Sequence, residues 1–209
     1  MRSPVTASPR NPAVTRGNLP LLLAFAWLWL SPLVHFWGAV WGPFRPFSYP
    51  QGDLAPSLGW FVAGLAVCFT PCALPMAYFK GWEGEHRARL FEAFGIRTFK
   101  RFATNGDLVN RWARRKDARH RVVRDEASAR AWAHAARGAE RNHLVFFLMG
   151  LLTTVYALRI GWHGWALALA ASNVVFNVYP VLLQRYNRLR IARICPLWAL
   201  PEDARAGPG

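Results

Sequence analysis

The chain has 209 residues, 53% of them apolar, and carries a formal net charge of +15. The two properties are separated along the chain: 16 of its 26 Lys and Arg residues lie between Lys80 and Arg141, while apolar residues form long uncharged blocks. A nucleic-acid-binding domain is also basic, but it has no need for uncharged blocks of membrane length. We therefore predict one all-α integral membrane domain over residues 1–209, with no nucleic-acid partner.

Four uncharged blocks predict four transmembrane helices, because a membrane span needs about 20 predominantly apolar residues. The first block is too long and too rich in tryptophan to be a signal peptide. The second contains Pro71 and Pro75, which predict kinks in its helix. The third and fourth are joined by the short turn "RIGWHGW", which predicts a helical hairpin. The predicted spans cover residues 19–41, 57–79, 142–160 and 164–183.

Most basic residues lie in three segments: the two chain ends and residues 80–141. The two remaining loops carry only Arg45 and Arg159, so the positive-inside rule predicts that both termini and residues 80–141 are cytoplasmic. Residues 80–141 should be helical and lie against anionic lipid. Gly95 is predicted to end an amphipathic helix there, and a later helix is predicted to run into the third span. The apolar side chains expected in the membrane interface are Leu90, Phe91, Phe94, Phe99 and Phe102.

Glu140 and His143 are the strongest candidates for acid–base chemistry. Three residues apart on a helix, they share a face, so the carboxylate is expected to orient the imidazole. Histidine titrates near neutral pH and serves as a general base in many enzymes. An ordinary polar pair at the membrane surface is the alternative. Glu83 and His86 form a weaker second pair, and no metal site is predicted.

The fourth span carries polar side chains at positions where lipid-facing residues would be apolar. Asn173, Asn177 and Gln184 fall within one narrow arc of a helix, and Asn187 and Arg188 flank this arc. Such residues usually face the interior of a helix bundle, where they tie helices together or line a site. For Asn173 the two roles remain open. For the "QRYN" stretch that begins at Gln184, the alternative is a basic flank that stops membrane insertion.

Three segments resemble one protein family. "NVYPVLLQRYNRLR" is similar to the C-terminal signature of the glycosyl-4,4'-diaponeurosporenoate acyltransferases, bacterial membrane proteins of carotenoid biosynthesis. "GEHRARLFEAFGIRTFKRF" resembles a second family block and places Lys100 on the family lysine. "RGAERNHLVFF" resembles a third and places Glu140 and His143 on the family Glu and His. Departures occur at Phe99 and Leu144, where the family has Trp, and at Leu189, where it has Pro.

The resemblance implies that a fatty acyl group is transferred to a sugar hydroxyl of a glycosylated carotenoid or a similar glycolipid. Acyl-CoA or another acyl donor would be the co-substrate, with no bound cofactor. The expected partners are membrane lipid, an apolar glycosylated acceptor and other enzymes of the pathway, in the bacterial cytoplasmic membrane. We assign His143 and Glu140 to catalysis. The residues assigned to substrate binding are Lys100, Asn177, Gln184, Arg185, Tyr186, Asn187 and Arg188.

The alternative is a non-catalytic membrane scaffold that binds anionic lipid through its basic segment. In such a scaffold lysine could replace the arginines, and Glu140, His143 and Asn177 would tolerate alanine. An acyltransferase would be selectively sensitive at those three positions.

Overall fold

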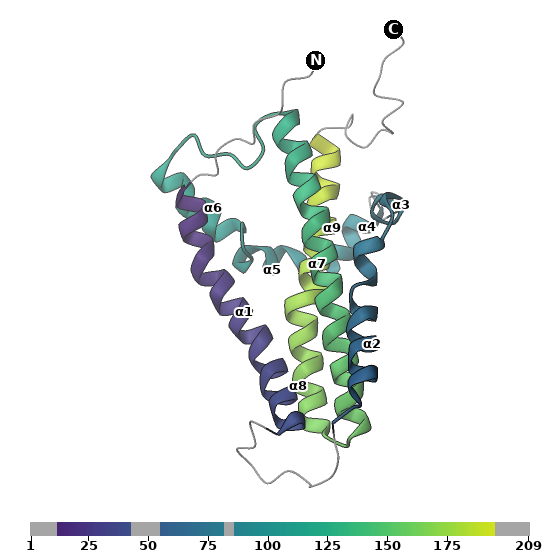
Figure 1. Cartoon of the computed structure of the whole chain (residues 1–209). Coiled ribbons are helices and arrows are strands. Elements are labelled where there is room, and N and C mark those ends of the chain that lie inside the picture. Colours follow the sequence, from purple (N-terminus) through teal and green to yellow (C-terminus); the bar gives the residue numbers. More distant parts are fainter. Residues whose placement is uncertain (1–11, 43–54, 82–85, 195–209) are drawn as a thin grey trace, which may run out of the picture. The chain divides into compact units, whose positions relative to one another are not determined.

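The computed structural model describes residues 12–42, 55–81 and 86–194 (Figure 1). Its regular elements within these ranges are helices, which confirms the predicted all-α class for the described part of the chain. The chain divides into two compact units. Unit 1 draws its described residues from Met1–Leu21, Pro75–Glu140 and Val181–Gly209, and unit 2 from Leu22–Leu74 and Arg141–Pro180. The single domain over residues 1–209 stays a prediction.

Three helical stretches among the described residues are long and apolar enough to cross a membrane: Val14–Trp41, Glu126–Arg159 and His163–Arg193. Large apolar side chains project outward from them, among them Trp27 and Leu167. Such exposure is costly in water and normal in lipid. These stretches include the first and fourth predicted spans and all of the third except residue 160, so the chain has the character of a membrane protein.

The second predicted span, residues 57–79, is not one continuous helix. It consists of α2 (Leu58–Cys68), the short 3-10 helix η1 (Thr70–Ala73) and α3 (Met76–Lys80). The helix is interrupted just before Pro71 and Pro75, because a proline cannot donate a backbone hydrogen bond. Leu74, directly before Pro75, is extended, as expected of a residue that precedes proline. A fourth membrane crossing therefore stays a prediction.

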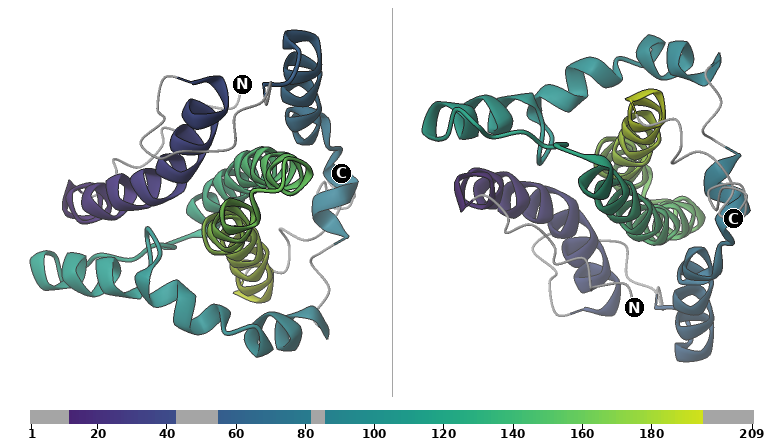
Figure 2. Two further views of the ribbon diagram at one scale, coloured as in Figure 1. Left: turned by 90° about the horizontal axis from the view of Figure 1, so that it is seen from below. Right: turned by 90° about the horizontal axis from the view of Figure 1, so that it is seen from above.

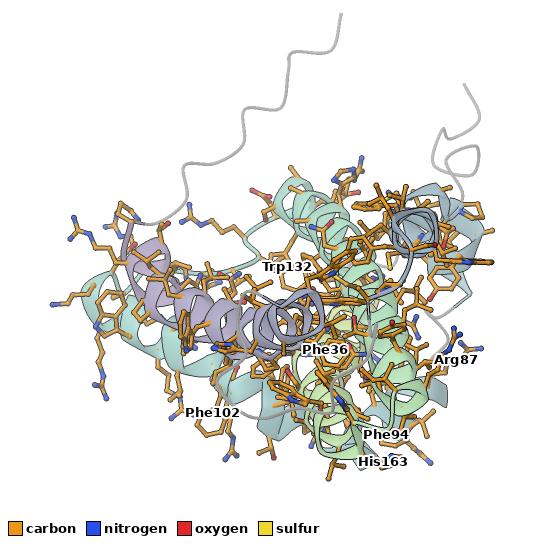
Figure 3. All side chains as sticks on the ribbon, turned by 60° about the horizontal axis from the view of Figure 1, so that its bottom comes forward. Phe36, Arg87, Phe94, Phe102, Trp132 and His163 are labelled. Carbon is orange, nitrogen blue, oxygen red and sulfur yellow. The ribbon has the colours of Figure 1, made fainter. Side chains whose placement is uncertain are left out.

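Unit 2 has an aromatic core between α1 (Pro12–Trp41), the second half of α7 (Glu126–Arg159) and α8 (His163–Asn173). Phe36, labelled in Figure 3, is wholly buried in this core and packs edge-on against Trp162. Gly161 adopts φ +78° in the turn after α7, a conformation that glycine tolerates best. The chain then reverses, and α8 returns beside α7 (Figure 2), which confirms the predicted hairpin.

Unit 1 contains α4 (His86–Ala93), α5 (Ile96–Phe102), α6 (Asp107–Lys116), the first half of α7 and most of α9 (Tyr179–Ile194). Gly95 has φ +71° between α4 and α5, so it ends the first amphipathic helix as predicted. Phe94 and Phe102, labelled in Figure 3, are 54% and 57% exposed. Phe91 is an exception to the predicted interfacial set, because it is buried in the protein.

α7 is continuous from the basic segment into the third predicted span, as the sequence analysis predicted. It begins at a reciprocal cap: the Ser128 backbone N–H donates to Asp125 Oδ1 at 2.8 Å, and the Asp125 N–H donates to Ser128 Oγ at 3.0 Å. Hydrogen bonds from the Ser128 backbone N–H and hydroxyl hold the pKa of the Asp125 carboxyl below its ordinary value. With 34 residues at about 1.5 Å each, α7 is longer than the hydrocarbon core of a membrane is thick.

Gly150 and Gly138 both lie within α7 and give a matched test of how closely this helix packs against its neighbours. A Cβ atom on Gly150 would stand 2.6 Å from Trp29 Cη2 and 2.7 Å from Asn173 Cγ, whereas Gly138 faces open space. We predict that Gly150→Ala destabilises the fold by about 1–3 kcal/mol through overpacking. Gly138→Ala should stabilise it by about 0.5–1 kcal/mol, because alanine is the better helix former. Thermal unfolding in detergent measures both, and equal midpoints for the two variants would contradict the packing described.

Candidate functional site

Glu140 is a charged residue with no exposed surface, and two arginines of α9 bind its carboxylate. Arg185 Nε donates to Glu140 Oε1 at 2.7 Å, and Arg188 Nη1 donates to Glu140 Oε2 at 2.6 Å. Arg188 is wholly buried as well. A buried carboxylate is strongly unfavourable unless it is paired and hydrogen-bonded. The two bonds meet this requirement and join α7 to α9 within unit 1.

Aromatic residues of α3 complete this cluster. Arg185 Nη2 donates to the Tyr78 hydroxyl at 2.5 Å, and the Arg185 guanidinium lies 5.6 Å from the centre of the Tyr78 ring. The Arg188 guanidinium lies 5.7 Å from the Phe79 ring centre. Arginine suits such a place because its planar group can hydrogen-bond at its edge and stack on an aromatic face. We call Tyr78, Phe79, Glu140, Arg185 and Arg188 the Glu140 cluster.

Tyr186 joins α9 to the amphipathic helices α4 and α5. Its hydroxyl donates to Glu92 Oε1 at 3.1 Å, and Arg97 Nη2 donates to the same oxygen at 2.7 Å. Tyr186 and Glu92 together raise the pKa of the Arg97 guanidinium above its ordinary value. The side chain of Tyr186 is buried and holds α4 in place, so its predicted contact with substrate stays a prediction.

A separate chain of polar groups lies in unit 2, around His143. Asn173 Nδ2 donates to the Phe147 carbonyl at 3.0 Å, Asn177 Nδ2 donates to Asn173 Oδ1 at 2.8 Å, and Asn177 Oδ1 lies 3.4 Å from His143 Nδ1. We call His143, Asn177, Asn173 and the Phe147 carbonyl the histidine relay.

A π-helical turn, η2 (Val174–Val178), carries Asn177 in this relay. The backbone N–H of Tyr179 donates to the Val174 carbonyl, five residues earlier, whereas an α-helix would join residues four apart. Pro180 follows directly and has no N–H to donate to the Phe176 carbonyl four residues before it. That carbonyl therefore lacks the donor that a regular α-helix would give it. Single π turns occur often at functional sites.

The other predicted site residues are placed as follows. Lys100 Nζ pairs with Asp107 Oδ1 at 3.2 Å, between α5 and α6. Gln184 and Asn187 are half-buried, and neither makes a side-chain hydrogen bond within the described part of the chain. Glu83 lies outside the described residues, as does the side chain of His86. No finding here tests substrate binding by any of these residues.

One sequence prediction needs correction. Glu140 was expected to orient His143, but both its carboxylate oxygens accept from arginines, and the residue on the imidazole is Asn177. The physical reason is the buried environment of Glu140, where two guanidinium groups stabilise the carboxylate more than a neutral ring would.

One protein-family model matches the part of the chain that contains these residues. The family model for glycosyl-4,4'-diaponeurosporenoate acyltransferase matches residues 75–196, more than half of the chain. The chain belongs to this family. The match includes every residue of the Glu140 cluster and of the histidine relay. Neither a curated protein nor a solved structure matches the chain.

Three residues of this acyltransferase-family protein were missed or left open by sequence reasoning. Tyr78 and Glu92 gave no signal, because each meets its partner on α9 only in the folded chain. Asn173 did give a signal: it precedes Asn177 by four residues, and such residues are neighbours on a helix. The same spacing fits helix association, so the sequence left both roles open.

Arg188→Lys tests whether the geometry of the Glu140 cluster matters beyond its charge. Lysine keeps the positive charge but lacks the planar group that reaches Glu140 and lies by Phe79. We predict a loss of about 1.5–3 kcal/mol of folding stability, the range for a hydrogen bond to a charged group. Arg190→Lys, on an exposed residue of the same helix, is the control and should leave the unfolding midpoint unchanged. Tolerance of lysine at both positions would instead favour a role for charge alone.

Proposed function

We propose that this chain transfers a fatty acyl group to a sugar hydroxyl of a glycosylated carotenoid or a similar glycolipid. The observation that carries the proposal is the family match over residues 75–196, since the family's name indicates acyl transfer in carotenoid biosynthesis. The helices of membrane length support it, because an acyl chain and a polyene are both too apolar to dissolve in water. Acyl-CoA or another activated acyl group would be the donor, with no bound cofactor.

In the proposed reaction His143 is the general base. Its unprotonated ring nitrogen takes the proton of the sugar hydroxyl while the hydroxyl oxygen attacks the carbonyl carbon of the acyl thioester. The resulting tetrahedral intermediate expels the thiolate, which takes the proton back from the imidazolium and leaves as a thiol. The products are an ester and a free thiol, and the histidine returns to its starting state.

The Glu140 cluster has a positioning role in this proposal. Its two arginines and Tyr186 belong to the "QRYNR" stretch and bind Glu140 and Glu92, so they fix this end of α9 within unit 1. Gln184 and Asn187 lie in the same stretch, and their amide groups make no hydrogen bond to the described residues, so they suit recognition of sugar hydroxyls. Lys100 is assigned to substrate binding in this proposal, and it would give up its ion pair with Asp107 to bind the substrate.

The exposed surface of α4 and α5 supports contact with anionic membrane lipid. Leu90, Phe94 and Phe102 are exposed there and alternate with exposed basic residues. Aromatic rings that enter a lipid interface beside arginines that stay in water are typical of helices lying on a membrane. The same surface would serve a non-catalytic scaffold, the second candidate function. We place this surface of α4 and α5 on the cytoplasmic side of a bacterial membrane, with both chain termini on the same side. The other enzymes of the pathway would be its neighbours there.

One experiment separates enzyme from scaffold. The protein is produced in bacteria engineered to make the glycosylated carotenoid, and pigment extracts are examined by mass spectrometry. We predict a product heavier by one esterified fatty acid, present only with the protein. His143→Ala should reduce that product at least about 100-fold, the lower end of what general-base catalysis contributes.

The matched control is His134→Ala, which changes an exposed histidine of the same helix and should leave product formation unchanged. Both variants must reach the membrane in equal amounts, as judged by immunoblotting. An unchanged pigment mass with the native protein would refute the acyltransferase assignment. Normal product with His143→Ala would refute only the role of the base.

A further inference from the structure

The donors and acceptors of the histidine relay can be assigned from one fixed end. The Phe147 carbonyl has lone pairs and no hydrogen, so the atom of Asn173 that lies 3.0 Å from it must be the donating Nδ2. This fixes the orientation of the Asn173 amide and turns its Oδ1 towards Asn177. An oxygen only accepts, so Asn177 in turn presents its Nδ2, at 2.8 Å.

The assignment continues to the imidazole. With Nδ2 of Asn177 committed to Asn173, its Oδ1 is the atom that faces His143 Nδ1, at 3.4 Å. A neutral histidine carries its hydrogen on one nitrogen and a lone pair on the other. Because Oδ1 can only accept, the hydrogen belongs on Nδ1.

We infer that Asn173 and Asn177 are positioning residues that hold His143 in the Nδ1–H tautomer, with the lone pair on Nε2. In this form Nε2 is the base and Nδ1 is committed to the protein. In the other neutral tautomer Nε2 carries the hydrogen, so that nitrogen has no lone pair with which to accept a proton. The inference deepens the proposed function, on which the task of Nε2 depends. The tautomer itself follows from the hydrogen bonds alone.

Two local features of the fold make the relay possible. Gly150 leaves the space in which the Asn173 side chain reaches α7, since a Cβ there would lie 2.9 Å from Asn173 Nδ2. The π turn η2 carries Asn177, whose Oδ1 is the acceptor that faces His143 Nδ1. A relay of this kind explains why polar residues occupy a helix that is otherwise apolar.

Nitrogen NMR of the full-length protein in lipid nanodiscs tests the tautomer directly. The protein is labelled with ¹⁵N-histidine, and the His143 signals are those missing from His143→Ala. We expect Nδ1 in the range of a protonated ring nitrogen and Nε2 in the range of an unprotonated one. The opposite assignment, or two protonated nitrogens at neutral pH, would overturn the inference whatever the activity of the enzyme.

Two variants of Asn173 distinguish the relay from simple packing. Asn173→Leu keeps the branching of the side chain but removes both hydrogen bonds, so Asn177 is free to turn and His143 should lose its single tautomer. Asn173→Asp retains an oxygen for Asn177 Nδ2, so the Nδ1–H tautomer should persist. Asn142→Leu makes the same chemical change at an exposed neighbour of His143 and is the control. A residue that only filled space would instead tolerate leucine better than the acid.

Activity links the tautomer to the reaction. We expect Asn173→Leu to lower kcat by about 10- to 100-fold, with KM little changed, because it displaces the base and no substrate contact. Asn173→Asp should recover much of this loss. A correct tautomer together with full activity of His143→Ala would refute the proposed base but leave the relay intact. Equal kcat values for Asn173→Leu and Asn142→Leu would overturn the positioning role.

Discussion

A buried carboxylate must be compensated by the protein around it, and the Glu140 carboxylate meets this constraint with two guanidinium groups. Both of its oxygens are bonded, to Arg185 and Arg188, and Arg185 is bonded in turn to Tyr78. These contacts bring three helices of unit 1 to one point, although their residues are far apart in the chain. Removing one charge from such a group would leave the others buried and uncompensated, which is far more costly than loss of an exposed ion pair.

The contrast within α7 illustrates this difference. Glu126 pairs with Arg130 at the start of the helix, and both side chains are largely exposed. An exposed pair of this kind contributes little. Glu140, a glutamate of the same helix, is by contrast wholly buried. The "QRYNR" stretch therefore has a structural explanation that is independent of any substrate: its arginines and tyrosine bind Glu140 and Glu92.

The histidine relay has a different character. Its bonds join neutral groups, and their value lies in direction, because each amide can donate at one end and accept at the other. The direction originates at the Phe147 carbonyl and ends at the imidazole. The family match indicates acyl transfer, the reaction in which we propose His143 as the base. The Glu140 cluster and the histidine relay thus differ in kind: charged groups compensate one another in unit 1, and neutral groups are joined by hydrogen bonds with a fixed direction in unit 2.

Much of this organisation could be predicted from the sequence. Long uncharged blocks are sufficient to predict helices, and Gly95 and Gly161 end helices at the predicted places because only glycine readily adopts their positive φ. The full interruption between α2 and α3 was harder to predict, since a proline in a membrane helix can either kink or break the helix. The pairing of Glu140 with two arginines of α9 could not be predicted, because the spacing of Glu140 and His143 in the chain also fits a pair on one helix face. Long-range pairings such as that of Tyr78 with Arg185 depend on tertiary structure, which local pattern does not contain.

The central claim is that Glu140 and Arg188 stabilise one another in the buried cluster. A double-mutant cycle tests it most directly, with Glu140→Gln, Arg188→Gln and the double variant compared by unfolding in detergent. Each single change should cost about 3–5 kcal/mol, because it leaves a buried charge uncompensated. The double variant should cost clearly less than the sum of the two, with a coupling energy of at least about 1.5 kcal/mol. Costs that simply add would contradict the claim.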